Sequence, residues 1–498
     1  MSLAAMVLAD RSERLVRFYD RWIGLVTFGA ADRVRELVLG EIAPGERLLD
    51  AGCGTGTLAV AAARSGAQVV AFDRSSAMLS LARQKADASG VTVDWRQGDI
   101  AFPPIGDERF DIATATFALS ELSRDMAALA VRRLARALRP GGRLVVADEG
   151  LLERPALRLL AAIPRFLLAI GSFFVLQQLA PARRHPWRSL LTEAGLEMDA
   201  ERSYQSGALR VLVASRPPDL AGRKRPVVAL TDVLPRGLRR ALLLAAAWID
   251  LPITIQPGVY RIGRPGPDGP VLLTGNFLAS VEAVRSALAG LDAYLVVEDT
   301  DGWNVWCASD AGLFNAEKAA ALFELYGLDG LVRRHEIIVP RLGGRIHSAL
   351  AALTGWKVAV GPIEARDLPV FLSMGLNPEM RSLQRMYRLP ERIRVAALTT
   401  IQLPLFLLPL RFIPASTRRP AWRLALLSSW LLPLANDVIP GRTGIVKGTL
   451  LGCIAALAGV GTKRVSPQAA VTMLATAPLV GWVYQSSSPV IFWKRLWR

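Results

Sequence analysis

The sequence has few of the residues that bind metals or cross-link small folds. Among its 498 residues are three cysteines and three histidines. These are too few for a disulfide scaffold, and no four-cysteine cluster is present to bind an iron–sulfur centre or a structural zinc ion. A reducing compartment suits such a chain. The first residues, MSLAAMVLADRSERLVRFYDRW, place acidic side chains soon after a short apolar run, so we expect no export signal.

Acidic residues are scarce relative to basic ones. The chain has 43 Asp and Glu against 60 Lys and Arg, a formal net charge of +17. Such an excess suits either nucleic acid or an anionic membrane surface. Hydrophobic residues make up 52% of the chain, which is high for a wholly soluble protein. Because the longest apolar runs lie near the C-terminus, we expect a membrane as partner and no nucleic acid.

The sequence divides into four segments. Residues 1–217 alternate short apolar strands with helical patterns, which predicts a parallel sheet. Residues 218–249, which include most of the stretch SRPPDLAGRKRP, are expected to form a linker. Residues 250–394 contain the strand-like runs VLLTG, AYLVVED, EIIVP and KVAVG, and predict a second α/β domain. Residues 395–498 predict an α-helical transmembrane domain.

The last segment contains long apolar runs such as GTLLGCIAALAGVG and AVTMLATAPLVGWVY. Several fall short of the roughly 20 residues that a spanning helix needs, and Pro404, Pro409 and Pro433 interrupt them, so we expect three or four spans. Cations in STRRPAWR, GTKR and KRLWR tend to keep these joints cytoplasmic. We therefore expect a multi-pass protein of the cytoplasmic membrane whose soluble domains face the cytoplasm. Cys453 would fill a helix, and Lys447 would reach the interface more readily than a polar cavity.

A glycine-rich turn comes after an early strand. Residues 47–59, RLLDAGCGTGTLA, predict a strand, a turn and the start of a helix, with glycine at Gly52, Gly54 and Gly56. In a doubly wound sheet such a turn brings backbone amides close to a ligand above the strand ends. A lone glycine-rich loop is also common as an ordinary strand-to-helix turn. The assignment therefore depends on the strands that come after this turn in the chain.

Two further strands end in carboxylates: AQVVAFDRS in Asp73, and WRQGDIAF in Asp99. Together with the turn LRPGGRLVVADE, this series resembles the class I S-adenosylmethionine-dependent methyltransferases over almost all of the first segment. That family's donor-site pattern, D-x-G-x-G-x-G, matches residues 50–56 position by position, from Asp50 to Gly56. The resemblance implies a Rossmann-like domain in which Asp73 holds the ribose of S-adenosylmethionine and Asp99 the adenine amino group. Cys53 would be a compact buried side chain.

The acceptor side of this segment is less distinctive. A long apolar insertion runs from Arg154 to Ala180. It could cover a hydrophobic substrate, lie on a bilayer or dock on the neighbouring domain, and its Arg158 and Arg165 suit the bilayer. No His, Glu or Tyr stands out as a general base.

The third segment places small or polar residues after its strands, where α/β sheets bind ligands. The stretches VLLTGNF, NVWCAS and KVAVGPIEARDLPVFL resemble the mercury-methylating corrinoid proteins. More distantly, they resemble the large corrinoid subunit of the acetyl-CoA pathway iron–sulfur protein. The similarity covers nearly all of residues 250–394 and, more loosely, the membrane segment. Its most specific element is the cap-helix motif N-V/I-W-C-A, here residues 304–308.

The resemblance implies a bound corrinoid with Cys307 as the lower axial ligand to cobalt. Trp306 would shield the corrin face and Asn304 would fix the cap by hydrogen bonds, although Trp is also a core filler and Asn a common turn residue. Three residues would line the corrin pocket or form a simple strand-end turn: Thr274, Gly275 and Asn276.

The residues around Cys307 also allow a plainer interpretation, since a free cysteine mostly packs as a small hydrophobe. The following pattern, NAEKAAALFELYG, predicts a helix with Ser309 and Asp310 available as caps, and amides at a helix start favour a thiolate. The resembled family continues with a small residue, Gly and Lys, where this chain has Ser309, Asp310 and Ala311.

These features and resemblances predict a methyltransferase that methylates cobalt from S-adenosylmethionine and passes the methyl group to a second acceptor. By resemblance to the mercury-methylating family, this acceptor would be Hg(II) or another metal or metalloid. A thiolate ligand would ease departure of the methyl group as a carbanion equivalent. A separate, ferredoxin-like iron–sulfur protein would act as reductant. One alternative keeps a small or lipid-like acceptor beside an independent corrinoid methyl carrier. Another is a membrane-anchored binding module with a decayed cobalt site.

Overall fold

The structure is a computed structural model that describes residues 30–106, 109–149, 185–204, 209–220, 222–248, 252–310, 312–343, 346–376, 389–441 and 443–486. The chain divides into two compact units, Met1–Pro226 and Val227–Arg498. Each unit is described by itself.

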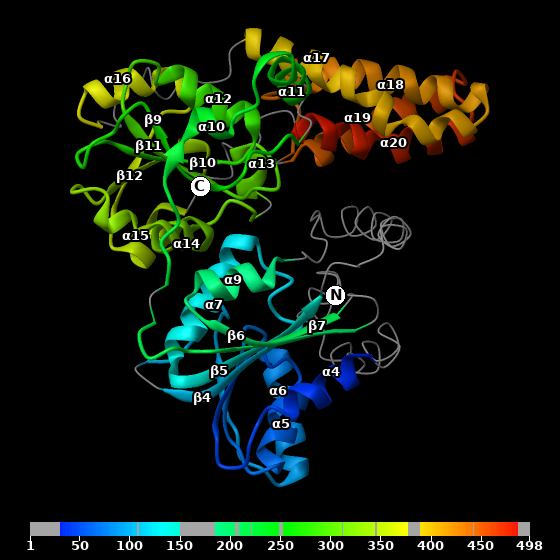
Figure 1. Cartoon of the computed structure of the whole chain (residues 1–498). Coiled ribbons are helices and arrows are strands. Elements are labelled where there is room, and N and C mark those ends of the chain that lie inside the picture. Colours follow the sequence, from blue (N-terminus) through cyan, green and yellow to red (C-terminus); the bar gives the residue numbers. More distant parts are fainter. Residues whose placement is uncertain are drawn as a thin grey trace. The chain divides into compact units, whose positions relative to one another are not determined.

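A seven-stranded sheet forms the centre of the first unit (Figure 1). Its order is β3-β2-β1-β4-β5-β7-β6. β1 lies parallel between β2 and β4, so the strand order reverses there, and a ligand is expected at the carboxyl ends of these strands. The strands are β1 (Arg47–Ala51), β2 (Gln68–Asp73), β3 (Asp94–Gln97), β4 (Phe110–Thr116), β5 (Leu138–Glu149), β6 (Glu197–Tyr204) and β7 (Leu209–Ser215).

The edge of this sheet departs from the parallel arrangement that the sequence predicts. β7 pairs antiparallel with both β5 and β6. Tyr204 and Leu209, which end β6 and begin β7, are too close in the chain for the crossover that parallel neighbours require. β7 and β6 therefore form an antiparallel pair at this edge of the sheet.

The helices of the first unit carry clear end signals. Ser75 accepts a hydrogen bond from the Met78 amide at the start of α6, and Gly90 ends that helix with φ of 65°. Apolar faces of α4 and α5 pack on β1 and β2 in one core cluster. The described helices are α4 (Ala30–Leu39), α5 (Thr57–Arg64), α6 (Ser76–Ser89), α7 (Arg124–Ala137) and α9 (Trp187–Glu193).

The second unit begins with a six-stranded sheet of order β13-β12-β10-β11-β9-β8. β10 lies parallel between β11 and β12, while β9 is antiparallel to β11. The strand order therefore reverses between β10 and β12, and this switch point is where a ligand crevice is expected. The strands are β8 (Val228–Ala229), β9 (Gly258–Ile262), β10 (Val271–Gly275), β11 (Ala293–Glu298), β12 (Glu336–Val339) and β13 (Lys357–Val360).

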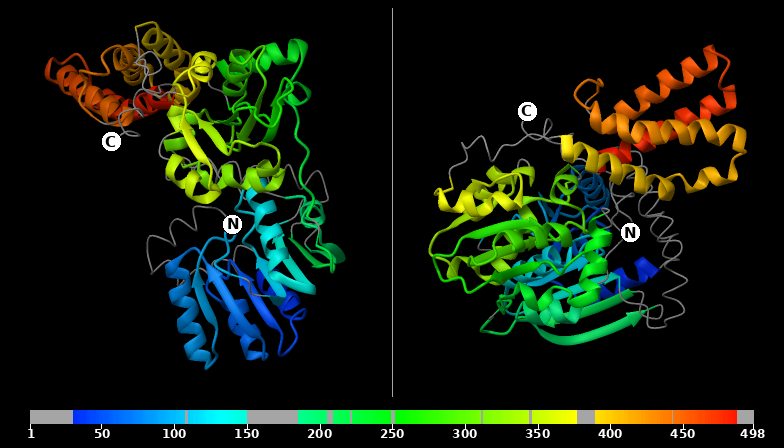
Figure 2. Two further views of the ribbon diagram at one scale, coloured as in Figure 1. Left: turned by 90° about the vertical axis from the view of Figure 1, so that its left-hand side faces the viewer. Right: turned by 90° about the horizontal axis from the view of Figure 1, so that it is seen from above.

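Helices cover both faces of this sheet (Figures 1 and 2). α13, α14 and α15 share one core cluster with alternate residues of β10 and β11, and α12 and α16 share the cluster on the other face. The elements are α10 (Leu230–Val233), α11 (Gly237–Trp248), α12 (Leu278–Ala287), α13 (Val305–Asp310), α14 (Ala316–Tyr326), α15 (Ile346–Thr354), α16 (Leu368–Ser373) and the 3₁₀ turns η1 (Leu328–Gly330), η2 (Arg341–Gly343) and η3 (Ala365–Asp367).

The expectation that residues 218–249 form a linker is wrong for most of that stretch. β8 pairs with β9 as an edge strand, and α10 and α11 follow it. Leu230 and Leu234 are buried in the second unit's core. Because a two-residue strand and short helices give little periodic signal, they are visible only through their packing.

Four long helices end the described chain: α17 (Leu389–Phe406), α18 (Ala415–Leu434), α19 (Gly444–Gly461) and α20 (Pro467–Ser486), with η5 (Leu408–Phe412) between the first two. Pro404 and Pro433 lie inside α17 and α18 near their ends, so they do not break the helices. Gly448 and Gly481 lie against backbone of the facing helix, which allows α19 and α20 to pack closely. Within these described residues, only α19 is both long and apolar enough to cross a membrane. The three or four predicted spans thus reduce to one supported candidate.

Two candidate functional sites

The glycine-rich turn after β1 lies at the switch point of the first sheet. Gly52, Gly54 and Gly56 have φ values of 70°, 54° and 74°, in the left-handed region that favours glycine. A Cβ atom on Gly52 would lie 2.6 Å from the Cβ of Ala118, and one on Gly56 would lie 2.6 Å from the ring of Trp95. The loop can therefore lie close to its neighbours only with glycine at these two positions.

Asp73, at the end of β2, is fixed beside this loop. Its Oδ2 accepts a hydrogen bond of 2.9 Å from the Gly54 amide, and its Oδ1 accepts one of 2.9 Å from the Ser75 amide. The next strand places Asp99 nearby, because the Gly98 amide donates to the Asp73 carbonyl at 3.1 Å. Oδ1 of Asp99 accepts from the Ala101 amide at 2.8 Å. The structure thus brings both predicted nucleoside carboxylates to one edge.

Asp50 is buried at the end of β1. The Thr114 hydroxyl donates to its Oδ1 at 2.8 Å, while Oδ2 is buried without a hydrogen-bond partner among the described residues. Burial, reinforced by the nearby Asp73 charge, raises the pKa of Asp50 to about 6. A buried acceptor without a donor fits a cationic ligand such as the ammonium or sulfonium group of S-adenosylmethionine. Cys53 packs beside the core, and burial raises the pKa of its thiol, so it is no nucleophile.

The loop after β4 contains a group that the sequence analysis missed. Phe117 has φ of 55°, and Oδ2 of buried Asp148 accepts hydrogen bonds from the Leu119 and Ser120 amides at 3.0 and 2.9 Å. Glu121 follows, and burial, with the charges of Asp148 and Asp73, raises its pKa to about 7. A general base is most effective with a pKa near the working pH. The motif contains no signal for Glu121, because Asp148 and Asp73 lie on other strands.

The carboxyl edge of the second sheet contains the three predicted pocket residues. Thr274 and Asn276 are buried, and a Cβ on Gly275 would lie 2.8 Å from the Thr300 side chain. Oδ1 of Asn276 accepts from the Thr300 amide, the Thr300 hydroxyl and the Gly302 amide, at 2.9, 3.0 and 3.0 Å. Its Nδ2 donates to Asp299 at 3.1 Å. Asn276 is therefore the centre of the loop before α13, which favours the strand-end turn over pocket lining.

α13 is a six-residue helix that contacts β10 and η2, so it lies over the switch point of the sheet. Oδ1 of Asn304 accepts from the Cys307 amide at 2.9 Å and caps the helix. Cys307 is half-buried in the first turn. Trp306 is also half-buried, and its Nε1 is buried without a hydrogen-bond acceptor among the described residues.

These residues fit a corrinoid. The Cys307 thiol lies at the ligand-binding edge of the sheet, and thiolate is a soft metal ligand. The Nε1–H of Trp306 is available to a carbonyl on the corrin periphery. The suggestion that Ser309 and Asp310 cap the following helix is wrong, because Asn315 caps α14 by accepting from the Lys318 amide at 3.0 Å.

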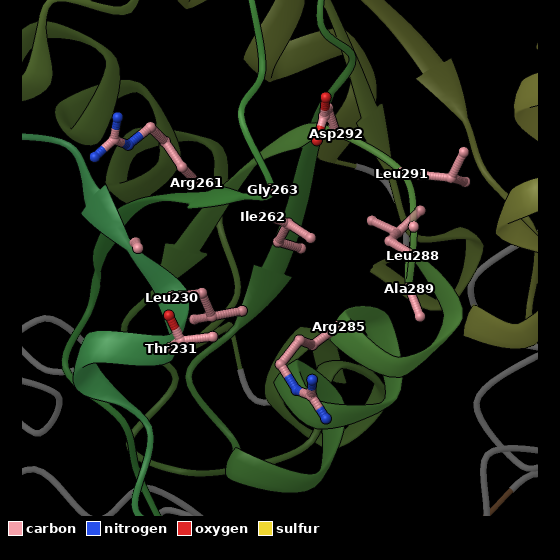
Figure 3. Close-up of a pocket in the computed structure, with 12 residues that line it drawn as sticks. Leu230, Thr231, Arg261, Ile262, Gly263, Arg285, Leu288, Ala289, Leu291 and Asp292 are labelled. Atoms are coloured by element: carbon pink, nitrogen blue, oxygen red, sulfur yellow. The ribbon is translucent and has the colours of Figure 1, made fainter.

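A hollow of about 400 Å³ lies at the opposite edge of this sheet (Figure 3). It opens beside Ile262 and Asp292, which border the paired ends of β9 and β11. The guanidinium groups of Arg261 and Arg285 lie on opposite sides of it (Figure 3). Since its charged groups do not converge, we do not assign it a ligand.

Two other predicted features have different outcomes. The apolar insertion from Arg154 to Ala180 lies outside the described residues. Lys447 in α19 does not reach outward as the sequence analysis favours: it is buried, and its Nζ donates to the Asn436 carbonyl. Cys453 is half-buried in the same helix.

Comparison with known protein families agrees with the two sites. Residues 48–142 match the methyltransferase domain family, and residues 246–372 match the CO dehydrogenase/acetyl-CoA synthase delta subunit family. The first part is similar to 2-phytyl-1,4-naphtoquinone methyltransferase of Synechococcus elongatus, 40% identical over 120 residues, which are 23% of this chain and 51% of that protein.

The second part is similar to two larger proteins. It is 33% identical over 130 residues to the acetyl-CoA decarbonylase/synthase complex subunit gamma of Archaeoglobus fulgidus, covering 26% of this chain and 28% of that subunit. It is 36% identical over 129 residues to the corrinoid/iron-sulfur protein large subunit of Moorella thermoacetica, covering 26% of this chain and 29% of that subunit. The chain thus spans under a third of either relative. It joins a methyltransferase domain to a domain similar to the corrinoid subunits of acetyl-CoA synthase complexes, and these similarities indicate S-adenosylmethionine and a corrinoid as cofactors.

Proposed function

We propose that the protein methylates the cobalt of its own corrinoid with S-adenosylmethionine and passes the methyl group to a second acceptor. The observation that supports this most directly is the position of Cys307, in a capped helix over the switch point of the second sheet. The same chain contains a complete glycine loop for the methyl donor. A donor site and a carrier site in one chain are what such a transfer requires.

In the first unit, the loop Gly52–Gly56 approaches the donor and Asp50 faces its positive charge. Asp73 and Asp99 bind the ribose and the adenine. Because Gly54 and Ser75 hold Asp73 through its carboxylate, the ribose site is positioned before the ligand arrives. Preorganisation of this kind reduces the entropy cost of binding.

In the second unit, Cys307 would hold the cobalt and Trp306 would donate a hydrogen bond to the corrin edge. When bound, the cobalt supplies a strong nucleophile for the donor methyl and a weak metal–carbon bond for its release. Asn304 holds the amide of Cys307, and Asn276 holds the loop that precedes it. These residues set the position of the ligand thiolate.

The second acceptor is proposed to be a thiophilic cation such as Hg(II) or another metal or metalloid, because a donating thiolate favours release of the methyl group with its electron pair. A separate iron–sulfur protein of the ferredoxin type would return the cobalt to its reduced state. We also propose that α17–α20 attach the protein to the cytoplasmic membrane as a multi-pass anchor, with both catalytic units on the cytoplasmic side. The apolar surface of α19 supports attachment.

The test is the visible spectrum of full-length protein purified with corrinoid supplied. The spectrum should change when reductant and S-adenosylmethionine are both present and with neither alone. Cys307→Ala should alter the axial-ligand signature, while Cys453→Ala, the matched control in α19, should leave it unchanged. If the protein retains no corrinoid while still binding S-adenosylmethionine, the proposal fails and so does a role for cobalt in this chain.

A second candidate function is favoured by Glu121: transfer of the methyl group to a small or lipid-like acceptor that loses a proton. Cobalt needs no base, whereas a hydroxyl, amine or acidic carbon acceptor does. Under this alternative, Glu121→Gln should abolish methylation of such an acceptor and leave the cobalt spectrum change intact. If Glu121→Gln leaves all methyl transfer unchanged, the second candidate is excluded.

A further inference from the structure

The helix that bears Cys307 is short and held mainly by the loops at its two ends. The loop before it, residues 299–304, is organised around Asn276. After it, the amides of Leu313 and Phe314 donate back to the Ala308 carbonyl at 2.7 and 3.1 Å. The position of the Cys307 thiol therefore depends on the groups that fix both loops.

One side chain bridges the two loops. Nζ of Lys318, in the first turn of α14, donates to the Asp299 carbonyl at 2.8 Å and to the Leu313 carbonyl at 2.7 Å. The first acceptor precedes α13 and the second follows it. Lys318 thus links the chain segments before and after α13.

Glu298 supplies a second tie. It ends β11 beside Gly275 of β10 and has 0% of its surface exposed. Its Oε1 accepts a hydrogen bond of 2.7 Å from the Asn315 amide, at the end of the loop after α13. Its Oε2 is buried without a hydrogen-bond partner among the residues that the structure describes. The carboxyl group therefore joins the sheet to the loop through one oxygen.

Whether Glu298 is charged depends on its second oxygen, Oε2. Burial raises the pKa of Glu298 to about 8; Lys318 and the Asn315 amide lower it, and Asp299 and Glu317 raise it further. At pH 7 the group is mainly neutral, with its proton on Oε2. The charged groups around it are then Lys318, Asp299 and Glu317, and Lys318 carries the positive charge among them. Above about pH 8 the ionised Glu298 carboxylate adds a further negative charge beside Lys318.

We propose that Glu298 and Lys318 are positioning residues for Cys307, and that together they hold both ends of α13 so that the thiolate meets the cobalt of the corrinoid. This inference rests on the proposed function for its consequence at cobalt, but the tie itself is a property of the chain alone. Lys318 acts through the backbone carbonyls on either side of α13. Glu298 acts through the hydrogen bond that it accepts from the Asn315 amide, and its proton keeps a further negative charge away from the two loops.

The first experiment needs no corrinoid. Hydrogen exchange of the Asn315 amide in full-length protein should accelerate about tenfold in Glu298→Ala, since a lost hydrogen bond costs about 1 kcal/mol or more. Glu298→Gln keeps a neutral acceptor and should exchange like the wild type. Asp268→Asn, at an exposed position before β10 and at the opposite edge of the sheet, is the control and should change nothing. Unchanged exchange in Glu298→Ala would overturn the tie.

The second experiment measures the reduction potential of bound cobalt against pH. In the wild type the potential should become more negative as pH rises through about 8, because ionised Glu298 opposes addition of an electron. Glu298→Gln should abolish this step, and Lys318→Met should shift the potential to more negative values and weaken the thiolate signature in the visible spectrum. A step that persists in Glu298→Gln would overturn the role of its proton.

The two hypotheses fail separately. If the wild type retains no corrinoid, the proposed function fails, while the exchange measurement still decides the tie. If the wild type binds corrinoid through Cys307 and both Lys318→Met and Glu298→Ala leave the thiolate signature intact, the positioning role fails and the proposed function stands.

Discussion

At the residue scale, burial converts carboxyl groups of both sites into groups that titrate near neutral pH. Asp50, Glu121 and Glu298 lie at strand ends or in the loops that follow strands. In Asp50 a hydroxyl, and in Glu298 a backbone amide, satisfies one oxygen of the carboxyl group and leaves the other without a partner among the described residues. This buried, unsatisfied oxygen makes the charged form costly. Such groups are candidates for ligand binding because a ligand can supply the missing partner.

We expect the affinity for S-adenosylmethionine to rise with pH until about pH 6, because the pKa of Asp50 is raised to about 6 and only the ionised form attracts the cationic donor. In the unliganded unit, stability depends on pH in the opposite direction. A raised pKa contributes stability that is full below the ordinary value of 3.8 and is lost as pH rises through about 6. Isothermal titration calorimetry from pH 5 to 8 measures the affinity. Asp50→Asn should bind weakly at every pH, and a retained pH slope in this variant would contradict the assignment.

Gly56→Ala should destabilise the first unit by about 3 kcal/mol. The substitution combines a left-handed backbone, at about 1 kcal/mol, with overpacking, at about 2 kcal/mol. A Cβ there would lie 2.7 Å from Ala82 and 2.6 Å from Trp95. Gly90→Ala is the control, because Gly90 has φ of 65° but open space around it. Urea unfolding should separate the two variants by about 2 kcal/mol, and equal losses would show that space is not limiting.

At the element scale, α13 owes its position to the loops around it more than to its own length. Six residues are too few for a helix that is stable alone. Val305 and Ala308 are buried in the core, and Asn304 satisfies the amide of Cys307. The loop before α13, which Asn276 holds by hydrogen bonds, also fixes the position of the helix.

Asn276→Ala should destabilise the second unit by about 3 kcal/mol, because three hydrogen bonds to Oδ1 are lost at about 1 kcal/mol each. Asn276→Asp keeps the acceptor but places a carboxylate beside Asp299. Its stability should lie between those of the wild type and Asn276→Ala. Thermal unfolding measures both. An alanine variant as stable as the wild type would mean that solvent or other groups replace this centre.

α19 offers a direct test of membrane attachment. Ile454 and Leu457 are 58% and 75% exposed on its surface. Replacing both with Lys should release the protein from membranes during alkaline carbonate washing, since each charge in the bilayer core costs about 3 kcal/mol. Thr462→Lys at the end of the helix is the control and should remain bound. Retention of the double variant would argue that α19 does not face lipid.

At the scale of the whole molecule, the chain consists of two units with separate cores. We expect two thermal transitions in scanning calorimetry. S-adenosylmethionine should raise only the transition of the first unit and corrinoid only that of the second, because a ligand stabilises the unit that it binds. A single transition raised by either ligand would show that the units unfold together.

The sequence predicts much of this organisation because its main signals are local. The donor motif from Asp50 to Gly56 and the cap motif around Cys307 are contiguous, and β10 to β13 coincide with the four strand-like runs of the third segment. The linker predicted over residues 218–249 is wrong from residue 228 onward, and the supported membrane spans are fewer than hydrophobic runs alone suggest. Packing of β8, α10 and α11 decides the first case, and the length and mean hydropathy of each whole helix decide the second.

The sequence by itself determined the two-domain pattern and, through its resemblance to known families, the expected cofactors, because the glycine spacing and the cap motif lie within a few consecutive positions. Only the tertiary structure added Glu121 and Glu298 to the candidate carboxyl groups. The charges of Asp148 and Asp73 raise the pKa of Glu121, and Glu298 accepts a hydrogen bond from the Asn315 amide. Strand pairing brings these distant parts of the chain together. Burial and partner geometry depend on that pairing, so the charge state of these groups follows from the fold.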